Sequence, residues 1–150
     1  MYLRFAFEGD VHRTLEMIPL SVRRKLDLSG LKLSLAAWTA LSRAERLAVC
    51  HLPVDSPEEL EVYREALRGF AERAGHPAAP LESGPADPRA WGKERIPEAL
   101  SARLPEAGAR IDPLAWGALP EDARYSLVKL AEPRRTPEKL ALALRELGIG

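Results

Sequence analysis

One segment occurs twice in this chain: residues 18–52 recur as residues 96–130 without a gap. The identical positions are Ile18-Pro19/Ile96-Pro97, Leu26/Leu104, Gly30/Gly108, Ala37-Trp38/Ala115-Trp116, Ala40-Leu41/Ala118-Leu119, Arg46/Arg124 and Leu52/Leu130. They fall at expected helix starts, at a helix-ending glycine and at bulky apolar side chains, whereas chance matches would scatter. An internal repeat has to be recognised before a fold is predicted. We therefore predict an internally duplicated domain.

Apolar residues at spacings of three and four predict helices in the first copy. The first stripe consists of Leu15, Ile18, Val22 and Leu26. Pro19 suits the first turn of that helix, and Gly30 suits its left-handed C-terminal position. Residues 42–45 have the form of a capping box, which opens a helix through about Leu52. Residues 55–59 open the longest predicted helix, which ends at Gly75.

The segment between the copies is rich in proline and lacks apolar periodicity, so it predicts a surface connector that Trp91 pins to the core. The second copy repeats the helix pattern. Pro97 opens a helix that Gly108 closes, and Asp112 and Thr136 precede prolines at two later helix starts. Each half of the chain is therefore predicted to contain the same series of helices.

These patterns predict an all-α fold of two helix–loop–helix halves related by a rough two-fold axis. Residues 2–8 alternate in polarity, which predicts a short N-terminal strand. The segments at Leu33 and Ile111 are expected to meet as a small β-bridge between the halves. Length predicts one domain over residues 1–150. Its parts are copy one at 18–74, the connector at 75–95 and copy two at 96–148.

The bulk composition excludes several classes of protein. The 22 basic and 22 acidic residues cancel, which argues against nucleic-acid binding driven by net charge. A single cysteine allows no internal disulfide, and the start of the chain has no signal-peptide pattern. No apolar run approaches the length of a membrane span. We expect a cytoplasmic protein that binds neither membrane nor nucleic acid, whose oligomeric state the sequence leaves open.

No motif in the chain indicates an enzyme, a cofactor or a metal site. The loop at residues 29–36 has no carboxylate for calcium, and His12, His51, His76 and Cys50 lack metal-ligand spacing. There is no glycine-rich phosphate loop and no nucleophile elbow. Cys50 is interpreted as a small core residue, although a metal site shared with a partner stays conceivable. We predict a non-catalytic protein without a cofactor.

The duplication separates scaffold positions from positions that are free for recognition. Trp38 and Trp116 are matched and predict core anchors, and Arg46 and Arg124 predict ties to neighbouring carbonyls. Copy one has a basic excess that copy two lacks, at residues 23–25 and Lys32. This excess is either a solvated helix face or a docking patch for an acidic partner.

The chain resembles the nitrate reductase-associated proteins in an ordered run of residues. The run is Phe5, Phe7, Glu8, Ile18-Pro19, Val22-Arg23, Lys25-Leu26-Asp27, Gly30, Lys32-Leu33, Trp38 and Arg46. The likeness continues through residues 56–67, the connector with Trp91 and residues 96–100, so it covers nearly the whole chain. One departure is Met17, where the family often has a cysteine, and it weakens any role for a thiol there.

The resemblance implies an accessory protein that supports the activity of an assimilatory nitrate reductase, a molybdenum and iron–sulfur enzyme. It would act as a chaperone-like maturation or stabilising factor. The expected contact residues on copy one and the N-terminal arm are Glu8, Arg23, Arg24, Lys25, Asp27 and Lys32. The alternative is a small-molecule binder with a pocket between the halves, lined by Trp38, Arg46 and Trp116.

Overall fold

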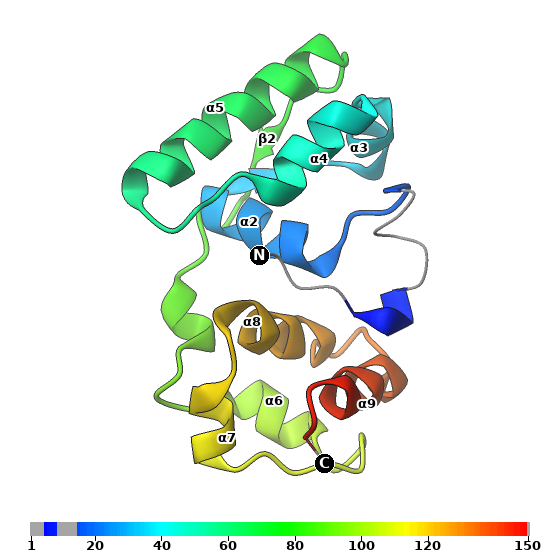
Figure 1. The fold of residues 1–150 in the computed structure, drawn as a ribbon, viewed down its shortest axis with the longest axis vertical. Coiled ribbons are helices and arrows are strands. Elements are labelled where there is room, and N and C mark those ends of the chain that lie inside the picture. Colours follow the sequence, from blue (N-terminus) through cyan, green and yellow to red (C-terminus); the bar gives the residue numbers. More distant parts are fainter. Residues whose placement is uncertain (1–4, 9–14, 150) are drawn as a thin grey trace. The chain divides into compact units, whose positions relative to one another are not determined.

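The computed structural model describes residues 5–8 and 15–149, and it divides into two compact units (Figure 1). The described part of unit 1 is residues 15–87. Unit 2 consists of residues 5–8 together with residues 88–149. The boundary between residues 87 and 88 falls inside the predicted connector. The described chain is mostly helical with one small sheet, which confirms the predicted all-α class.

Unit 1 is built around its longest helix. Its elements are α2 (Leu20–Ser29), β1 (Leu31–Lys32), α3 (Leu35–Ala40), α4 (Arg43–His51), α5 (Pro57–Arg73) and β2 (Ala79–Pro80). Helix α5 packs against α2, α3 and α4, and Tyr63 and Leu67 on its inner face are buried (Figure 1). Helix α2 also contacts α4 and β1, so it is surrounded on several sides.

The helix ends of unit 1 follow the predicted capping residues. Gly30 ends α2 with a φ of 73°, in the left-handed region that glycine tolerates. The hydroxyl oxygen of Ser34 accepts from the amide of Ala37 at 3.0 Å. Ser42 and Glu45 form the predicted capping box at the start of α4. These contacts join residues three positions apart, so the local sequence is enough to specify them.

The small sheet differs from the predicted β-bridge. Strand β1 pairs antiparallel with β2, with Leu31 opposite Pro80 and Lys32 opposite Ala79. Both strands belong to unit 1, and Ile111 lies outside any strand. The connector supplies the partner strand because it runs back along the end of α2, where Leu81 N donates to the Gly30 carbonyl at 2.8 Å. The prediction that the segments at Leu33 and Ile111 pair was therefore wrong.

Unit 2 is centred on helix α8. Its elements are the 3₁₀ helices η1 (Ala6–Glu8) and η2 (Pro88–Trp91), followed by α6 (Glu98–Arg103), α7 (Pro113–Ala118), α8 (Glu121–Leu130) and α9 (Pro137–Glu146). Helix α8 contacts α6, α9 and η2, and α9 contacts η1 (Figure 1). Trp91 is buried and meets Tyr125 edge-to-face, with ring centroids 4.9 Å apart. Trp91 therefore pins the connector to a core, as predicted.

Two predictions for unit 2 need correction. Residues 6–8 form a 3₁₀ turn rather than a strand, since the amide of Glu8 donates to the Phe5 carbonyl at 3.1 Å; residues 2–4 lie outside the described residues. Helix α6 ends at Arg103 instead of continuing toward Gly108. The reason is Pro105, which has no N–H for the next helical bond and whose ring crowds the preceding turn. The first copy has Asp27 at the matched position.

Helices α3 and α7 begin at matched positions of the two copies, as do α4 and α8. Common starts do not establish a common backbone path, so the duplication stays a prediction, as does the single-domain assignment. No helix in the described residues is both long and apolar enough to cross a membrane.

Candidate functional site

The six residues predicted to contact a partner differ in exposure and in position. Four of them keep exposed surface, namely Glu8, Arg23, Asp27 and Lys32. Glu8 belongs to unit 2 and the others to unit 1. Arg24 and Lys25 are buried, with exposed fractions of 7% and 5%. These two side chains therefore do not belong to a solvated helix face, whereas their contact with a partner stays a prediction.

Lys25 uses its ammonium group inside unit 1. Its Nζ donates to the carbonyl oxygens of Cys50 at 2.7 Å and Leu52 at 2.6 Å. These carbonyls belong to the end of α4, where they lack helical partners and where the helix dipole favours a cation. Nζ also lies 5.9 Å from the ring centroid of Tyr63, within cation–π range. Lys25 therefore fastens α2 to the end of α4.

The interior next to Lys25 also contains Tyr63 and Cys50, both fully buried. The hydroxyl of Tyr63 donates to the carbonyl of Val49 at 3.0 Å. Burial raises the pKa of Tyr63 far above its ordinary value; Cys50 acts in the same direction and Arg24 opposes it. The prediction that Cys50 is a core residue is confirmed. Among the described residues no group of three or more His, Cys, Asp or Glu side chains could hold a metal ion.

The residues predicted to line a pocket between the halves act as anchors within their own units. Trp38 and Trp116 have no exposed surface. In unit 1, Trp38 Nε1 and an Arg46 guanidinium nitrogen both donate to the carbonyl of Leu15 at 2.7 Å. In unit 2, Trp116 Nε1 donates to the Gly92 carbonyl at 2.9 Å. The predictions of core tryptophans and a carbonyl-tying arginine are confirmed, whereas the pocket stays a prediction.

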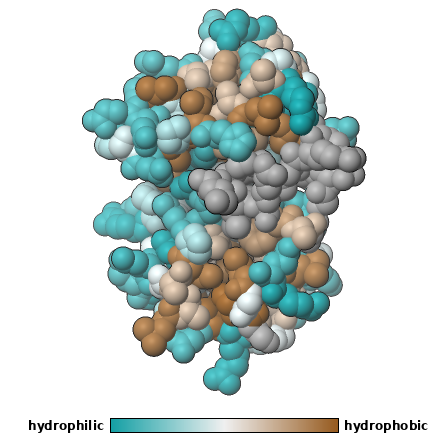
Figure 2. Space-filling model, in the orientation of Figure 1, coloured by the Kyte–Doolittle hydropathy of each residue, from teal (hydrophilic) through white to brown (hydrophobic). Residues whose placement is uncertain are grey.

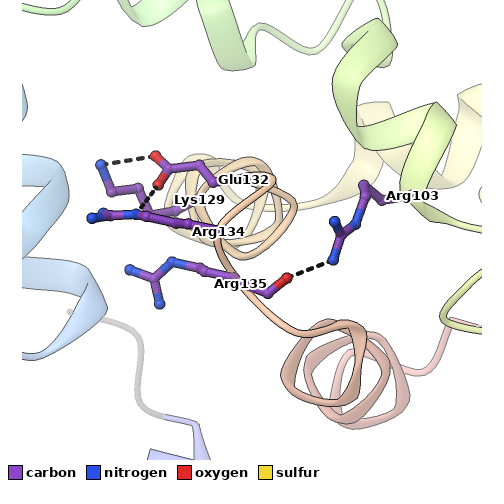
Figure 3. Close-up of polar contacts among 5 residues, drawn as sticks. All are labelled: Arg103, Lys129, Glu132, Arg134 and Arg135. Carbon is purple, nitrogen blue, oxygen red and sulfur yellow. Dashed lines mark hydrogen bonds and ion pairs between the residues drawn. The ribbon is translucent and has the colours of Figure 1, made fainter.

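Cationic side chains gather where α8 turns into α9, and we call this group the α8–α9 basic cluster (Figure 3). Its members are Arg103, Lys129, Arg134 and Arg135. Figure 3 shows that Lys129, Arg134 and Arg135 extend to the same side of the turn. Glu132 pairs with Lys129 Nζ at 3.1 Å and with Arg134 Nε at 3.0 Å. One carboxylate thus links two of the cations.

The members of the cluster have different tasks. Arg103 on α6 donates to the Arg135 carbonyl at 2.6 Å and pairs with Glu106 at 3.1 Å, with only 18% of its side chain exposed. This arginine therefore holds the turn in place. The side chain of Arg134 is 71% exposed, so its guanidinium faces solvent. Arg134 is the member best placed to meet a partner.

Local sequence explains how the cluster arises. Helix α8 ends at Leu130, and Pro133 prevents it from continuing. The amide of Arg135 donates to the Glu132 carbonyl at 2.9 Å and closes the turn before Pro137 starts α9. Two adjacent arginines are thereby placed in a short turn between two helices. Cations at the end of α8 also suit the negative end of its dipole.

Partial burial acts to raise the pKa of Glu132, but its hydrogen bonds and charge interactions with Lys129 and Arg134 outweigh this. The pKa of Glu132 therefore lies below its ordinary value, and the carboxylate stays ionised at neutral pH. Glu132 therefore carries the charge that its pairs with Lys129 and Arg134 require.

Comparison of residues 18–52 with residues 96–130 could not indicate Arg134 and Arg135, because they lie four and five positions beyond the end of the second copy. A usable signal was present, since a proline-flanked Arg-Arg pair between two predicted helices is expected on a turn at the surface.

A second polar site in unit 2 has no clear preference for a ligand. A pocket of about 350 Å³ is lined by Arg89, Ala90, Gly92, Glu94, Arg95, Pro97 and Glu98. Its two arginines are matched by two glutamates, so the charged lining favours neither anions nor cations. We assign no role to this pocket.

A family model described as conserved nitrate reductase-associated protein matches residues 4–147 of the chain. No curated protein matches the chain. No solved structure matches it either.

Proposed function

Because the chain belongs to the nitrate reductase-associated protein family, we propose that it is a non-catalytic accessory factor that binds a partner protein. The family description makes nitrate reductase the expected partner. The chain would support the assembly or activity of that enzyme, in the cytoplasm, without taking part in its chemistry.

The observation that carries the proposal is the α8–α9 basic cluster. Lys129, Arg134 and Arg135 extend to one side of this turn, and 71% of the side chain of Arg134 is exposed. An exposed guanidinium such as that of Arg134 can form a bidentate pair of hydrogen bonds with a carboxylate of a partner. Exposed charges of this kind steer and orient an encounter more than they supply affinity.

This proposal moves the centre of the interface from copy one to unit 2. Lys25 and Arg24 are buried, and Lys25 satisfies carbonyls of its own unit. The exposed Lys32 stays a candidate contact, as do the partly exposed Glu8, Arg23 and Asp27.

The experiment measures association of the purified chain with purified nitrate reductase from the same cells at low and high salt. The test variant is Arg134→Glu/Arg135→Glu, and the control is Arg43→Glu/Arg68→Glu, which makes the same charge change at exposed positions of unit 1. We expect the test variant to associate about tenfold more slowly than wild type at low salt, with a smaller difference at high salt.

Circular dichroism and thermal unfolding establish that both variants are folded. The milder variant Arg134→Ala should give a smaller effect in the same direction. Equal association rates for wild type and the Arg134→Glu/Arg135→Glu variant would contradict the role of the cluster. Absence of any complex with wild type would contradict the accessory function itself.

A further inference from the structure

Unit 1 has a groove with an apolar floor and acidic residues at its edge, in contrast to the α8–α9 basic cluster of unit 2. It lies where the chain leaves α4 and enters α5. It has a volume of about 350 Å³ and is lined by Leu52, Pro53, Glu58, Glu59 and Val62. We call it the α4–α5 groove. It contains none of the residues of the α8–α9 basic cluster, so a ligand of this groove would bind at a different site.

The floor of the groove is apolar and open to solvent. Val62 is 57% exposed, although it lies on a helix whose outer face is otherwise largely charged. Figure 2 shows apolar side chains between hydrophilic ones in the region of α5. Pro53 is exposed and Leu52 is partly exposed beside Val62. An apolar surface with a polar rim is typical of a site that a partner covers.

The walls of the groove are held in place before any partner arrives. Lys25 Nζ binds the Leu52 carbonyl at 2.6 Å and fixes the chain where it leaves α4. Glu59 accepts from the amide of Asp55 at 2.9 Å, and Ser56 caps the first turn of α5. A preorganised wall lowers the entropic cost of binding. The buried lysine therefore helps to fix the shape of the groove.

The charges at the rim define what can occupy the groove. Glu58 and Glu59 lie in the first turn of α5 and line its edge. The helix dipole explains why acidic residues lie in the first turn of α5. It does not explain why the apolar side chain of Val62, one turn further along, is exposed. The nearby Glu61 is already paired with Arg64 at 2.8 Å. The rim therefore favours a cationic partner.

We propose that the α4–α5 groove binds a basic amphipathic segment of a partner protein. An apolar side chain of that segment packs on Val62, Leu52 and Pro53. Lysine or arginine side chains that flank it pair with Glu58 and Glu59. Helix-in-groove recognition of this type combines apolar anchors with charged flanks.

The test uses a fluorescein-labelled synthetic peptide of about four helical turns that has leucines on one face and lysines on the other. A peptide of the same composition in scrambled order is the reference. Fluorescence anisotropy with the full chain should show the amphipathic peptide binding at least about tenfold more tightly than the scrambled one. Equal binding of the two peptides would reduce the interaction to net charge and overturn the proposal.

Two variants connect binding to the groove. Val62→Ser should weaken binding of the amphipathic peptide by about fivefold or more, because the apolar anchor loses its contact. Leu114→Ser is the matched control: Leu114 is 84% exposed, belongs to unit 2 and should leave binding unchanged. Equal losses in both variants would overturn the assignment to this groove.

Sedimentation of the wild type without peptide tests another occupant. Self-association that Val62→Ser abolishes would show that a second copy of the chain covers the groove, and it would also overturn the proposal. These outcomes are independent of the Arg134→Glu/Arg135→Glu experiment, which alters a different unit.

Discussion

Trp38 donates its indole N–H to the carbonyl oxygen of Leu15 at 2.7 Å. Arg46 donates to the same oxygen at 2.7 Å. Leu15 is fully buried and has a φ of 55°, in the left-handed region that costs a bulky residue about 1–3 kcal/mol. Two strong donors on one carbonyl hold this backbone in place. Two residues that the predicted repeat assigns to the scaffold thus secure the segment that leads into α2.

Substitution of Trp38 tests this arrangement. Trp38→Phe keeps an aromatic ring but removes the donor and part of the packed volume. We expect the free energy of unfolding to fall by about 2–3 kcal/mol, measured by urea denaturation. The Arg46→Met variant should show coupling with Trp38→Phe in a double-mutant cycle, because the two donors share one acceptor. Strict additivity would contradict the shared clamp.

Substitution of Lys25 and of Lys32 by methionine should differ strongly in its effect on stability. Lys25→Met removes a buried cation that binds two carbonyls, and it should lower the free energy of unfolding by about 1.5–3 kcal/mol. Lys32 is exposed, so Lys32→Met should change the free energy of unfolding by less than about 0.5 kcal/mol. The measurement is chemical denaturation at neutral pH. Similar small effects for both residues would mean that Lys25 is not a structural tie.

Alanine substitutions at Gly30 and Gly108 can distinguish the cost of backbone strain from the cost of steric crowding. Both have a left-handed φ, 73° and 69°. A Cβ at Gly30 would lie 2.8 Å from Pro85 Cγ, whereas a Cβ at Gly108 would meet nothing within 4 Å. Gly108→Ala should therefore cost about 1 kcal/mol, and Gly30→Ala clearly more. Thermal unfolding of the two variants side by side decides this, and equal losses would contradict the close approach of Pro85.

The burial of Tyr63 should make the free energy of unfolding depend on pH in the alkaline range. The pKa of Tyr63 is raised in the folded state, so its stabilising contribution is complete below the ordinary tyrosine pKa of about 10 and is lost as pH rises above that value. The free energy of unfolding should fall less steeply between about pH 9 and pH 11 in Tyr63→Phe than in wild type. Urea denaturation across this range measures both slopes, and identical slopes would show that Tyr63 does not contribute.

The helix starts were predictable because their contacts are local. Ser34, Ser42 and Ser56 each cap an amide three positions further along the chain, and those pairs can be read directly from the sequence. The core role of Trp38 and Trp116 was predictable because bulky side chains at matched positions are needed by any shared scaffold. The family was recognisable because its motif is an ordered run of residues that can be compared position by position in the sequence.

The candidate site was less predictable, because exposure depends on how many neighbours an element has. The apolar stripe of α2 indicated one buried face, yet α4, α5 and β1 all contact this helix, and Arg24 and Lys25 are buried as well. Periodicity reports the direction of the most apolar face and not the number of partners around a helix.

Short-range hydrogen bonds and side-chain volume specify the helical class, the caps and turns, and the tryptophan anchors, so these features could be predicted from the amino-acid sequence. The pairing of β1 with β2 and the burial of Lys25 became visible only in the folded chain. Those features depend on contacts between residues far apart in the chain, and the free energy of a charge is set by the groups that surround it after folding.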